Sequence, residues 1–244
     1  MSTDQQSPSS SSPLLISEEV KSSLFIVIAA FQEQTVIGDV VRALTSEGLN
    51  VVVVDDGSVD HTGKYAQDAG ATVLRHLINR GQGAALQTGI SYSLKQDAQY
   101  IVTFDADGQH DINDLPAMLD PIITGRAAFT LGSRFLGNSS EVPAFRKLIL
   151  KAAVIFTRLF SQVQLTDAHN GFRVMNAESA QHIDIQLDRM AHASEIIDQL
   201  CHSGLPFEEV PITIRYTEYT LAKGQRSSNA IRVAADYLFN KLFS

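Results

Sequence analysis

Two aspartates, Asp105 and Asp107, stand at the end of an apolar run and are followed by Gly108. Side chains two residues apart lie on one face of a strand, so a turn after the strand can direct both carboxylates to one point. There the carboxylates repel each other unless a cation or a shared proton lies between them. Mg²⁺ and Mn²⁺ prefer such oxygen ligands, and Mg²⁺ usually combines one or two carboxylates with substrate phosphates. The pattern predicts a metal site that holds a diphosphate; a plain turn built on aspartate hydrogen bonds is the alternative.

The composition indicates a globular protein and excludes several classes of function. The 244 residues, 44% of them hydrophobic, suffice for one domain with a sizeable core. A net charge of −8 argues against a general nucleic-acid binder. The single cysteine, Cys201, excludes a disulfide framework, fits a reducing compartment and is expected to be a buried helix residue. No apolar run approaches the roughly 20 residues that a membrane span needs.

The chain is expected to divide into three parts. Residues 1–22 begin with a stretch rich in Ser, Gln and Pro that lacks the basic and apolar regions of a signal peptide, and they are expected to form a disordered tail. The main domain is expected over residues 23–218. A flexible loop and an amphipathic helix are expected over residues 219–244.

Within the main domain, continuous apolar runs alternate with amphipathic segments. This alternation is typical of a parallel sheet covered by helices on both faces, a doubly wound α/β fold. Strands are expected at 24–30, 51–54, 72–74, 100–104 and 127–131, and helices at 35–47, 62–69, 84–96 and 115–123. Residues 207–215 alternate around Pro211 and predict a short hairpin or an edge strand.

Polar residues gather where four of these strands end, at 31–33, 55–58, 79–83 and 105–109. Because ligands of such sheets bind at the carboxyl ends of the strands, these clusters outline one crevice. Gly81 and Gly83 precede a helix, whose N-terminal N–H groups can receive an anion. The sequence lacks a P-loop, and Leu86 stands where a dinucleotide fingerprint needs its third glycine.

Five motifs follow one another along the chain: Asp55-Asp56-Gly57-Ser58, Asn79-x-Gly81-x-Gly83, Asp105-Ala106-Asp107-Gly108-Gln109-His110, Gly132-Ser133-Arg134 and Asn170-Gly171-Phe172-Arg173. Together they resemble family 2 glycosyltransferases of the GT-A fold. The branch of dolichyl-phosphate mannose synthase and bacterial polyprenyl-phosphate sugar transferases is the most similar. The resemblance covers residues 24–216. It implies a Rossmann-like, mostly parallel sheet with flanking helices and a small C-terminal hairpin or helical region.

The resemblance implies a site for a UDP- or GDP-sugar and a divalent metal, Mg²⁺ or Mn²⁺. The metal ligands would be Asp105, Asp107 and Gln109, with Asp107 as the principal one. The family's Pro-x-Tyr-Asn-Glu opening is Ala-Ala-Phe-Gln-Glu here, which could alter the nucleotide preference, and Gln82 replaces a usual basic residue. The nucleotide-sugar site would contain Ala29, Phe31, Glu33, Asp55, Asp56, Asn79, Gly81, Gly83, Asp105 and Ala106.

The implied reaction is transfer of a hexosyl group, with inversion, through a transition state that resembles an oxocarbenium ion. The metal held by Asp107 and the guanidinium of Arg134 would stabilise charge on the leaving diphosphate. A lipid phosphate acceptor is already anionic and needs no strong base, whereas a sugar hydroxyl needs one. Glu195 is the candidate base and Asp167 the second choice; a solvated helix glutamate is the alternative for Glu195.

A basic, apolar segment at 145–160 favours a polyprenyl phosphate acceptor. Such a helix can lie in a membrane interface, although packing on the domain or on a second subunit of a homo-oligomer is the alternative. The acceptor site would contain Arg134, Arg146, His169 and Arg173. We expect a cytoplasmic protein, peripheral at the inner face of the membrane or bound to a membrane partner subunit.

Two further functions stay open on the sequence. The same enzyme class could act on a saccharide acceptor in cell-surface polysaccharide synthesis. The protein could also be a nucleotide-sugar-binding scaffold subunit without catalysis. The intact set of Asp105, Asp107 and Gln109 argues against the scaffold, because a subunit that only binds need not keep a metal site.

Overall fold

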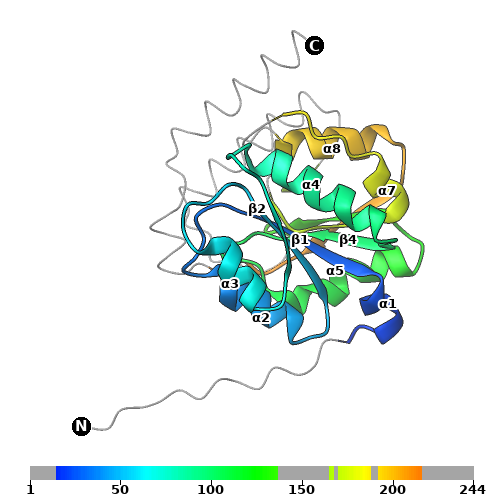
Figure 1. The fold of residues 1–244 in the computed structure, drawn as a ribbon. Helices are drawn as coiled ribbons and strands as arrows, with labels where there is room; N and C mark the ends of the chain where they lie inside the picture. Colours follow the sequence, from blue (N-terminus) through cyan, green and yellow to red (C-terminus); the bar gives the residue numbers. More distant parts are fainter. Residues whose placement is uncertain (1–14, 137–164, 168–169, 188–191, 216–244) are drawn as a thin grey trace.

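The computed structural model describes residues 15–136, 165–167, 170–187 and 192–215 (Figure 1). These residues form a seven-stranded sheet with helices on both faces. The segments expected at 145–160 and 219–244 lie outside the described residues, as do Arg146 and His169.

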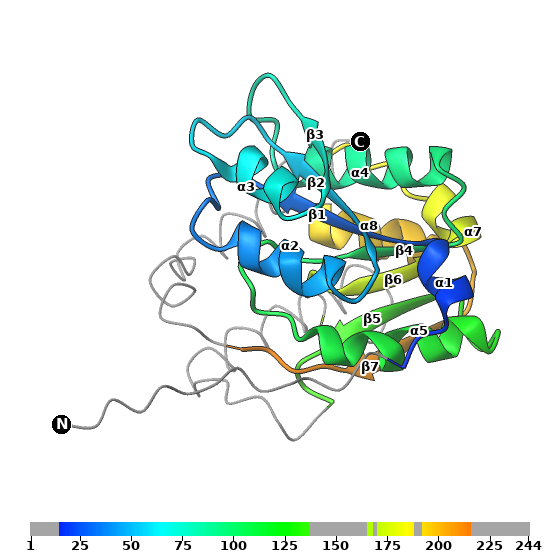
Figure 2. The ribbon, with the colours of Figure 1, turned by 60° about the horizontal axis from the view of Figure 1, so that its bottom comes forward.

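The strands lie in the order β3-β2-β1-β4-β6-β5-β7. Their bounds are β1 Leu24–Ala30, β2 Asn50–Asp55, β3 Thr72–Arg75, β4 Tyr100–Thr103, β5 Phe129–Ser133, β6 Arg173–Asn176 and β7 Phe207–Pro211. The first four pair in parallel, β7 pairs in parallel with β5, and β6 runs antiparallel to both of its neighbours, β4 and β5. The sheet is therefore mostly parallel, with one reversed strand inside it (Figure 2).

Two groups of helices sandwich the sheet. One face carries α2 Ile37–Thr45, α3 Thr62–Asp68 and α5 Leu115–Ile123, and the other carries α4 Gln82–Lys95, α7 Ala177–Gln181 and α8 His192–His202 (Figures 1 and 2). A short helix, α1 Glu18–Ser22, precedes β1, and a 3-10 turn, Ile112–Asp114, precedes α5. Cys201 is half-buried on α8, where burial raises the pKa of its thiol to about 11.

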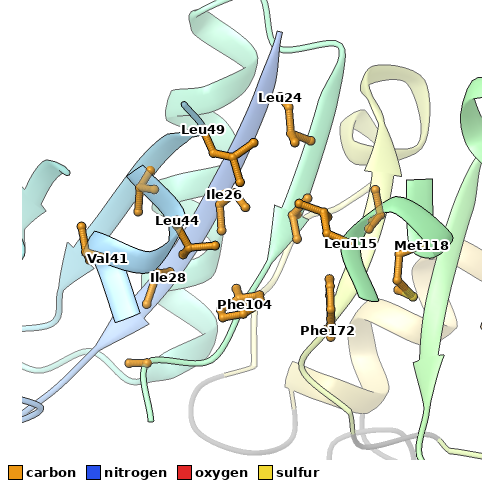
Figure 3. Close-up of a cluster of buried hydrophobic side chains, with 14 of the residues drawn as sticks. Leu24, Ile26, Ile28, Val41, Leu44, Leu49, Phe104, Leu115, Met118 and Phe172 are labelled. Atoms are coloured by element: carbon orange, nitrogen blue, oxygen red, sulfur yellow. The ribbon is translucent and has the colours of Figure 1, made fainter. Parts of the chain in front are cut away.

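The pleat of β1 assigns its side chains to two cores. Ile26 and Ile28 join the core beneath α2 and α5 (Figure 3), whereas Val27 joins the core beneath α4. A Cβ on Gly89 of α4 would overlap the Val27 side chain, so this glycine permits close packing of helix on strand. Both faces of the strand are buried, which explains why its sequence is continuously apolar.

The structure confirms the doubly wound fold, decides between two alternatives and changes two details. Of the hairpin and the edge strand predicted over 207–215, the structure has an edge strand at 207–211, since among the described residues β7 pairs with β5 alone. The internal antiparallel strand β6 was not predicted, because its four residues begin with Arg173, end with Asn176 and form no apolar run. Ser17 caps α1 and Ile16 joins the core, so the folded part begins before residue 23.

Candidate active site

The order of the strands reverses at β1, because β2 follows on one side and β4 lies on the other. Ligands of open α/β sheets bind at such a switch point, beyond the carboxyl ends of the strands. The Phe104 N–H donates to the Val27 carbonyl at 3.0 Å, so Asp105 lies just beyond this hydrogen bond between the ends of β1 and β4. Glu33, which follows β1, interacts electrostatically with Asp107. The structure thus brings together the polar clusters after β1 and β4, as predicted.

Asp105 is surrounded by cationic groups. Burial alone would raise the pKa of its carboxyl group, but the charge and the 2.9 Å hydrogen bond of His110 lower it, and Arg173 and His192 lower it further. The balance holds the pKa of Asp105 below its usual value, so the group stays ionised. The His110 ring packs against Phe104 and Phe172, which fixes its orientation. Such a partner orients a metal-binding carboxylate, and the sequence analysis had assigned His110 no role.

Asp107 shows the opposite shift. Burial raises the pKa of its carboxyl group, and repulsion from Asp105 and Glu33 raises it further. Gln109 partly offsets this, because its backbone N–H and its side-chain amide donate to the two carboxylate oxygens at 3.1 and 2.6 Å. A carboxyl group whose pKa is raised by neighbouring carboxylates fits a divalent cation, which would relieve the repulsion.

The donor set suits a hard cation that substrate phosphates also bind. In the described part of the chain, no group of three or more His, Cys, Asp and Glu side chains could hold a metal ion by itself. Asp105, Asp107 and Gln109 supply oxygen ligands only. This is the pattern of Mg²⁺ or Mn²⁺ sites, in which the protein gives few ligands and the substrate completes the shell.

Strand β6 closes the site from the other side. Thr103 on β4 donates to the carbonyl of Gly171 at 2.6 Å, and a Cβ on Gly171 would overlap both carboxylate oxygens of Asp105. Asn170 accepts from the Phe172 N–H at 2.8 Å, while its buried amide nitrogen has no hydrogen-bond partner among the described residues. The Asn-Gly-Phe-Arg motif therefore packs directly on the first aspartate of the Asp-x-Asp pair.

Arg134 follows β5 and is bound by Asp167. Its Nε and Nη2 donate to the two carboxylate oxygens at 2.6 and 2.8 Å, and its backbone N–H donates to one of them. Glu209 on β7 accepts from the Thr166 and Asp167 N–H groups, which holds the segment in place. Asp167 thus orients the arginine, and as the second-choice base it would have to leave this contact.

Arg173 does not present a surface to an acceptor. Its side chain is buried with 2% exposure on β6, and burial lowers the pKa of its guanidinium to about 10, with Asp105 and Asp167 opposing the shift. The group therefore stays charged at neutral pH and links the two aspartates electrostatically. Its contact with the acceptor stays a prediction, and in this structure the side chain is buried beside Asp105.

Glu195 on α8 holds a loop. Its two carboxylate oxygens accept the N–H groups of Gln186 and Leu187 at 3.0 and 2.9 Å. This loop lies against the start of α4, since a Cβ on Gly83 would be 2.6 Å from the Leu187 carbonyl oxygen. Both carboxylate oxygens of the predicted general base are therefore hydrogen-bonded to backbone N–H groups beside the crevice.

The remaining nucleotide-binding candidates gather after β1 and β2. Phe31 is 40% exposed, and the next two N–H groups, of Gln32 and Glu33, donate to Ser58 and Thr62. Asp55 and Asp56 are buried, and their carboxylates bind the loops around them rather than opening to solvent. Asn79, Gly81 and Gly83 lie at the start of α4, as the sequence indicated.

The family model of glycosyl transferase family 2 matches residues 25–184, a range that contains the whole crevice. The chain belongs to glycosyl transferase family 2. Two relatives extend the likeness over most of the chain. An uncharacterized protein of Methanocaldococcus jannaschii is 35% identical over 93% of this chain and 96% of its own. The UDP-N-acetylglucosamine–dolichyl-phosphate N-acetylglucosaminyltransferase of Methanococcus voltae is 30% identical over 82% of this chain and 89% of its own.

Solved structures agree on the fold of this family 2 glycosyltransferase. Glucosyl-3-phosphoglycerate synthase from Mycobacterium tuberculosis, in complex with Mn²⁺, UDP and phosphoglyceric acid, superimposes with a TM-score of 0.64. The identity is 17%, over 90% of this chain and 81% of that one, so the likeness shows the GT-A fold alone. Among the described residues, no helix has the length and apolar character needed to cross a membrane.

Proposed function

We propose that this glycosyltransferase moves a hexosyl group from a UDP- or GDP-sugar to a polyprenyl phosphate, with inversion at the anomeric carbon. The choice of acceptor rests on the hydrogen bonds that the two candidate bases make. The Glu195 carboxylate binds backbone N–H groups, and the Asp167 carboxylate binds Arg134. A phosphate acceptor is already anionic and needs no base, whereas a sugar hydroxyl does.

The donor would lie across the carboxyl ends of β1, β2 and β4. Exposed Phe31 offers a flat surface on which a nucleobase can stack. Asp105, Asp107 and Gln109 would hold Mg²⁺ or Mn²⁺, which when bound acts as a Lewis acid on the diphosphate. The relative from Methanococcus voltae, whose name includes UDP-N-acetylglucosamine and dolichyl phosphate, supports this donor and acceptor class.

In the transfer, an acceptor phosphate oxygen attacks the anomeric carbon, and the bond from this carbon to the donor diphosphate breaks. Negative charge grows on the leaving nucleoside diphosphate. The Arg134 guanidinium, held rigid by Asp167, would stabilise this charge without reorganising. Arg173, buried next to Asp105, adds positive potential beneath the aspartates.

The polyprenyl phosphate would be reached at a membrane surface. We propose peripheral contact with the cytoplasmic face of the membrane, or with a membrane partner subunit, because the acceptor lipid is anchored in the bilayer. The alternative, a saccharide acceptor, would require Glu195 or Asp167 to leave its present partners.

Release of nucleoside diphosphate from a panel of UDP- and GDP-sugars tests the proposal. Each donor is offered with and without Mg²⁺ or Mn²⁺ and with and without a short-chain polyprenyl phosphate, and Asp107→Asn serves as the control. We expect metal-dependent release that rises with the lipid and is lost in the variant. Release that ignores the lipid would support a saccharide acceptor, and nucleotide binding without any release would support a scaffold.

A further inference from the structure

The buried carboxyl group of Asp56 lies beside the place proposed for the donor diphosphate. The Asp56 side chain is 3% exposed and accepts the N–H groups of Arg80 and Gly81 at 2.9 and 2.7 Å. These are the two residues before α4, whose first N–H groups have no carbonyl partner within the helix. Asp56 therefore shapes the loop, but its charge alone would repel a diphosphate at the same helix end.

A histidine, His76, faces this carboxylate. It follows β3, and its Nδ1 lies 2.7 Å from an Asp56 carboxylate oxygen. On the other side of the ring, Nε2 lies 3.0 Å from the hydroxyl oxygen of Thr88 on α4. The His76 side chain is only 10% exposed, and its backbone N–H donates to the Asp55 carbonyl. The ring is thus fixed at both nitrogens between the β2 loop and α4.

Both ring nitrogens of His76 face oxygen atoms. The Thr88 hydroxyl lies 2.9 Å from the Ala84 carbonyl, to which it can donate, so its oxygen can accept from Nε2. An ionised carboxylate only accepts, so Nδ1 can donate to Asp56. An imidazolium at this position would make both contacts and would neutralise the buried carboxylate.

We propose that His76 is a positioning residue for the donor diphosphate. It neutralises Asp56, and it ties the β2 loop and the Arg80–Gly81 turn to α4. The proposal rests on the donor site of the proposed function. The sequence analysis singled out neither His76 nor Thr88, since neither residue belongs to a motif and the contact needs three segments to meet. Asp56, taken from the resemblance as a nucleotide ligand, acts here through the loop it holds.

The test compares binding of a nucleoside diphosphate with binding of the corresponding nucleoside, in the presence of Mn²⁺, by titration calorimetry. The variants are His76→Ala, His76→Asn and Thr88→Val. Asparagine keeps a donor near the Nδ1 position but carries no charge. Thr88→Ser keeps the hydroxyl as a conservative rescue, and His182→Asn changes an exposed histidine directly after α7 as the matched control.

We expect His76→Ala and His76→Asn to weaken nucleoside diphosphate binding about tenfold or more, because an unbalanced charge remains near the phosphates. Binding of the nucleoside should change less than about twofold, and the donor KM should rise while kcat stays similar. Thr88→Ser and His182→Asn should resemble the wild type. Nitrogen NMR of the ring should show both nitrogens protonated at neutral pH.

Several outcomes would overturn the proposal. Equal losses for nucleoside and nucleoside diphosphate would show that His76 only maintains the fold, which thermal melts of each variant check. Unchanged nucleoside diphosphate binding in His76→Asn, or a neutral ring, would exclude the role of its charge. If the wild type itself binds no nucleoside diphosphate, the proposed function is wrong. This outcome differs from a failure of the His76 proposal alone, in which the wild type binds the nucleoside diphosphate and the variants bind it equally well.

Discussion

Gly171 packs so closely on Asp105 that a Cβ at position 171 would overlap both oxygens of the aspartate carboxylate. The two residues are far apart in the sequence and meet because β6 pairs antiparallel with β4. The Thr103 hydroxyl bonds to the Gly171 carbonyl and locks this approach. A glycine in a short motif thereby determines where the carboxylate proposed to bind the metal can point.

Gly171→Ala should displace the Asp105 carboxylate and weaken Mn²⁺ binding about tenfold or more, since a ligand moved by a fraction of an ångström loses its geometry. Electron paramagnetic resonance of bound Mn²⁺ measures this affinity. Gly38→Ala on α2 is the control, because its Cβ would meet only the end of the Arg42 side chain. Normal Mn²⁺ affinity in Gly171→Ala would mean that Asp105 does not bind the metal.

Removing the hydrogen bond of His110 should make metal binding more sensitive to acid. His110→Phe keeps an aromatic ring against Phe104 and Phe172 but loses the contact that lowers the pKa of Asp105. That pKa should rise, so that Asp105 takes up a proton at a higher pH as the solution is acidified. We expect roughly ten- to a hundredfold weaker Mn²⁺ binding, with the loss larger at low pH.

Calorimetric titrations at two pH values check this, with His202→Phe on the exposed end of α8 as control. A His110→Phe variant whose Mn²⁺ affinity follows the wild type at both values would contradict the role given to His110.

Asp107→Asn should abolish activity but stabilise the metal-free protein. The pKa of Asp107 is raised in the fold by burial and by Asp105, so its ionisation costs stability as the pH rises from the unfolded pKa to the folded one. At neutral pH this cost is present in full, and asparagine removes it. Thermal melts should give a higher Tm for the variant without metal and a smaller gain on adding Mn²⁺. If the metal-free variant had a lower Tm than the metal-free wild type, the repulsion between Asp105 and Asp107 would already be relieved in the wild type.

Arg134 and Asp167 should behave as one unit. Either Arg134→Met or Asp167→Leu leaves a nearly buried partner charge without its bidentate contact, which typically costs about 3–5 kcal/mol. The double variant should lose much less free energy of unfolding than the sum of the two. Denaturant unfolding of the four proteins completes the cycle. Additive losses would mean that the two charges do not interact.

Glu195→Gln should retain most of the activity with a polyprenyl phosphate. The change removes a charge from a group that accepts backbone N–H bonds, so it should lower the Tm while leaving kcat within a few-fold. Gln199→Leu removes a similar contact from α8 to Asp184 and serves as control. A fall in kcat of about 10² or more at unchanged Tm would make Glu195 a base and would favour a saccharide acceptor.

The elements and the place of the crevice could be read from local patterns. Buried parallel strands are continuously apolar, helices alternate with them, and the carboxyl-end rule then puts Glu33, Asp105 and Asp107 at one edge of the sheet. The motifs also gave the family, because they preserve the residues that end each strand.

The partners of the site residues needed the tertiary structure. Asp105 with Gly171, Arg134 with Asp167 and Asp56 with His76 are joined by contacts between segments that no local periodicity connects. The reversed strand β6 is only Arg173–Asn176, with a charged residue at one end and a polar one at the other, so no apolar run indicated a strand there or showed that Arg173 is buried behind Asp105. The sequence by itself determined which chemical groups reach the crevice, through short-range patterns. Only the packing of distant segments decided which carboxylates stay available for a metal and which are bound by the protein itself.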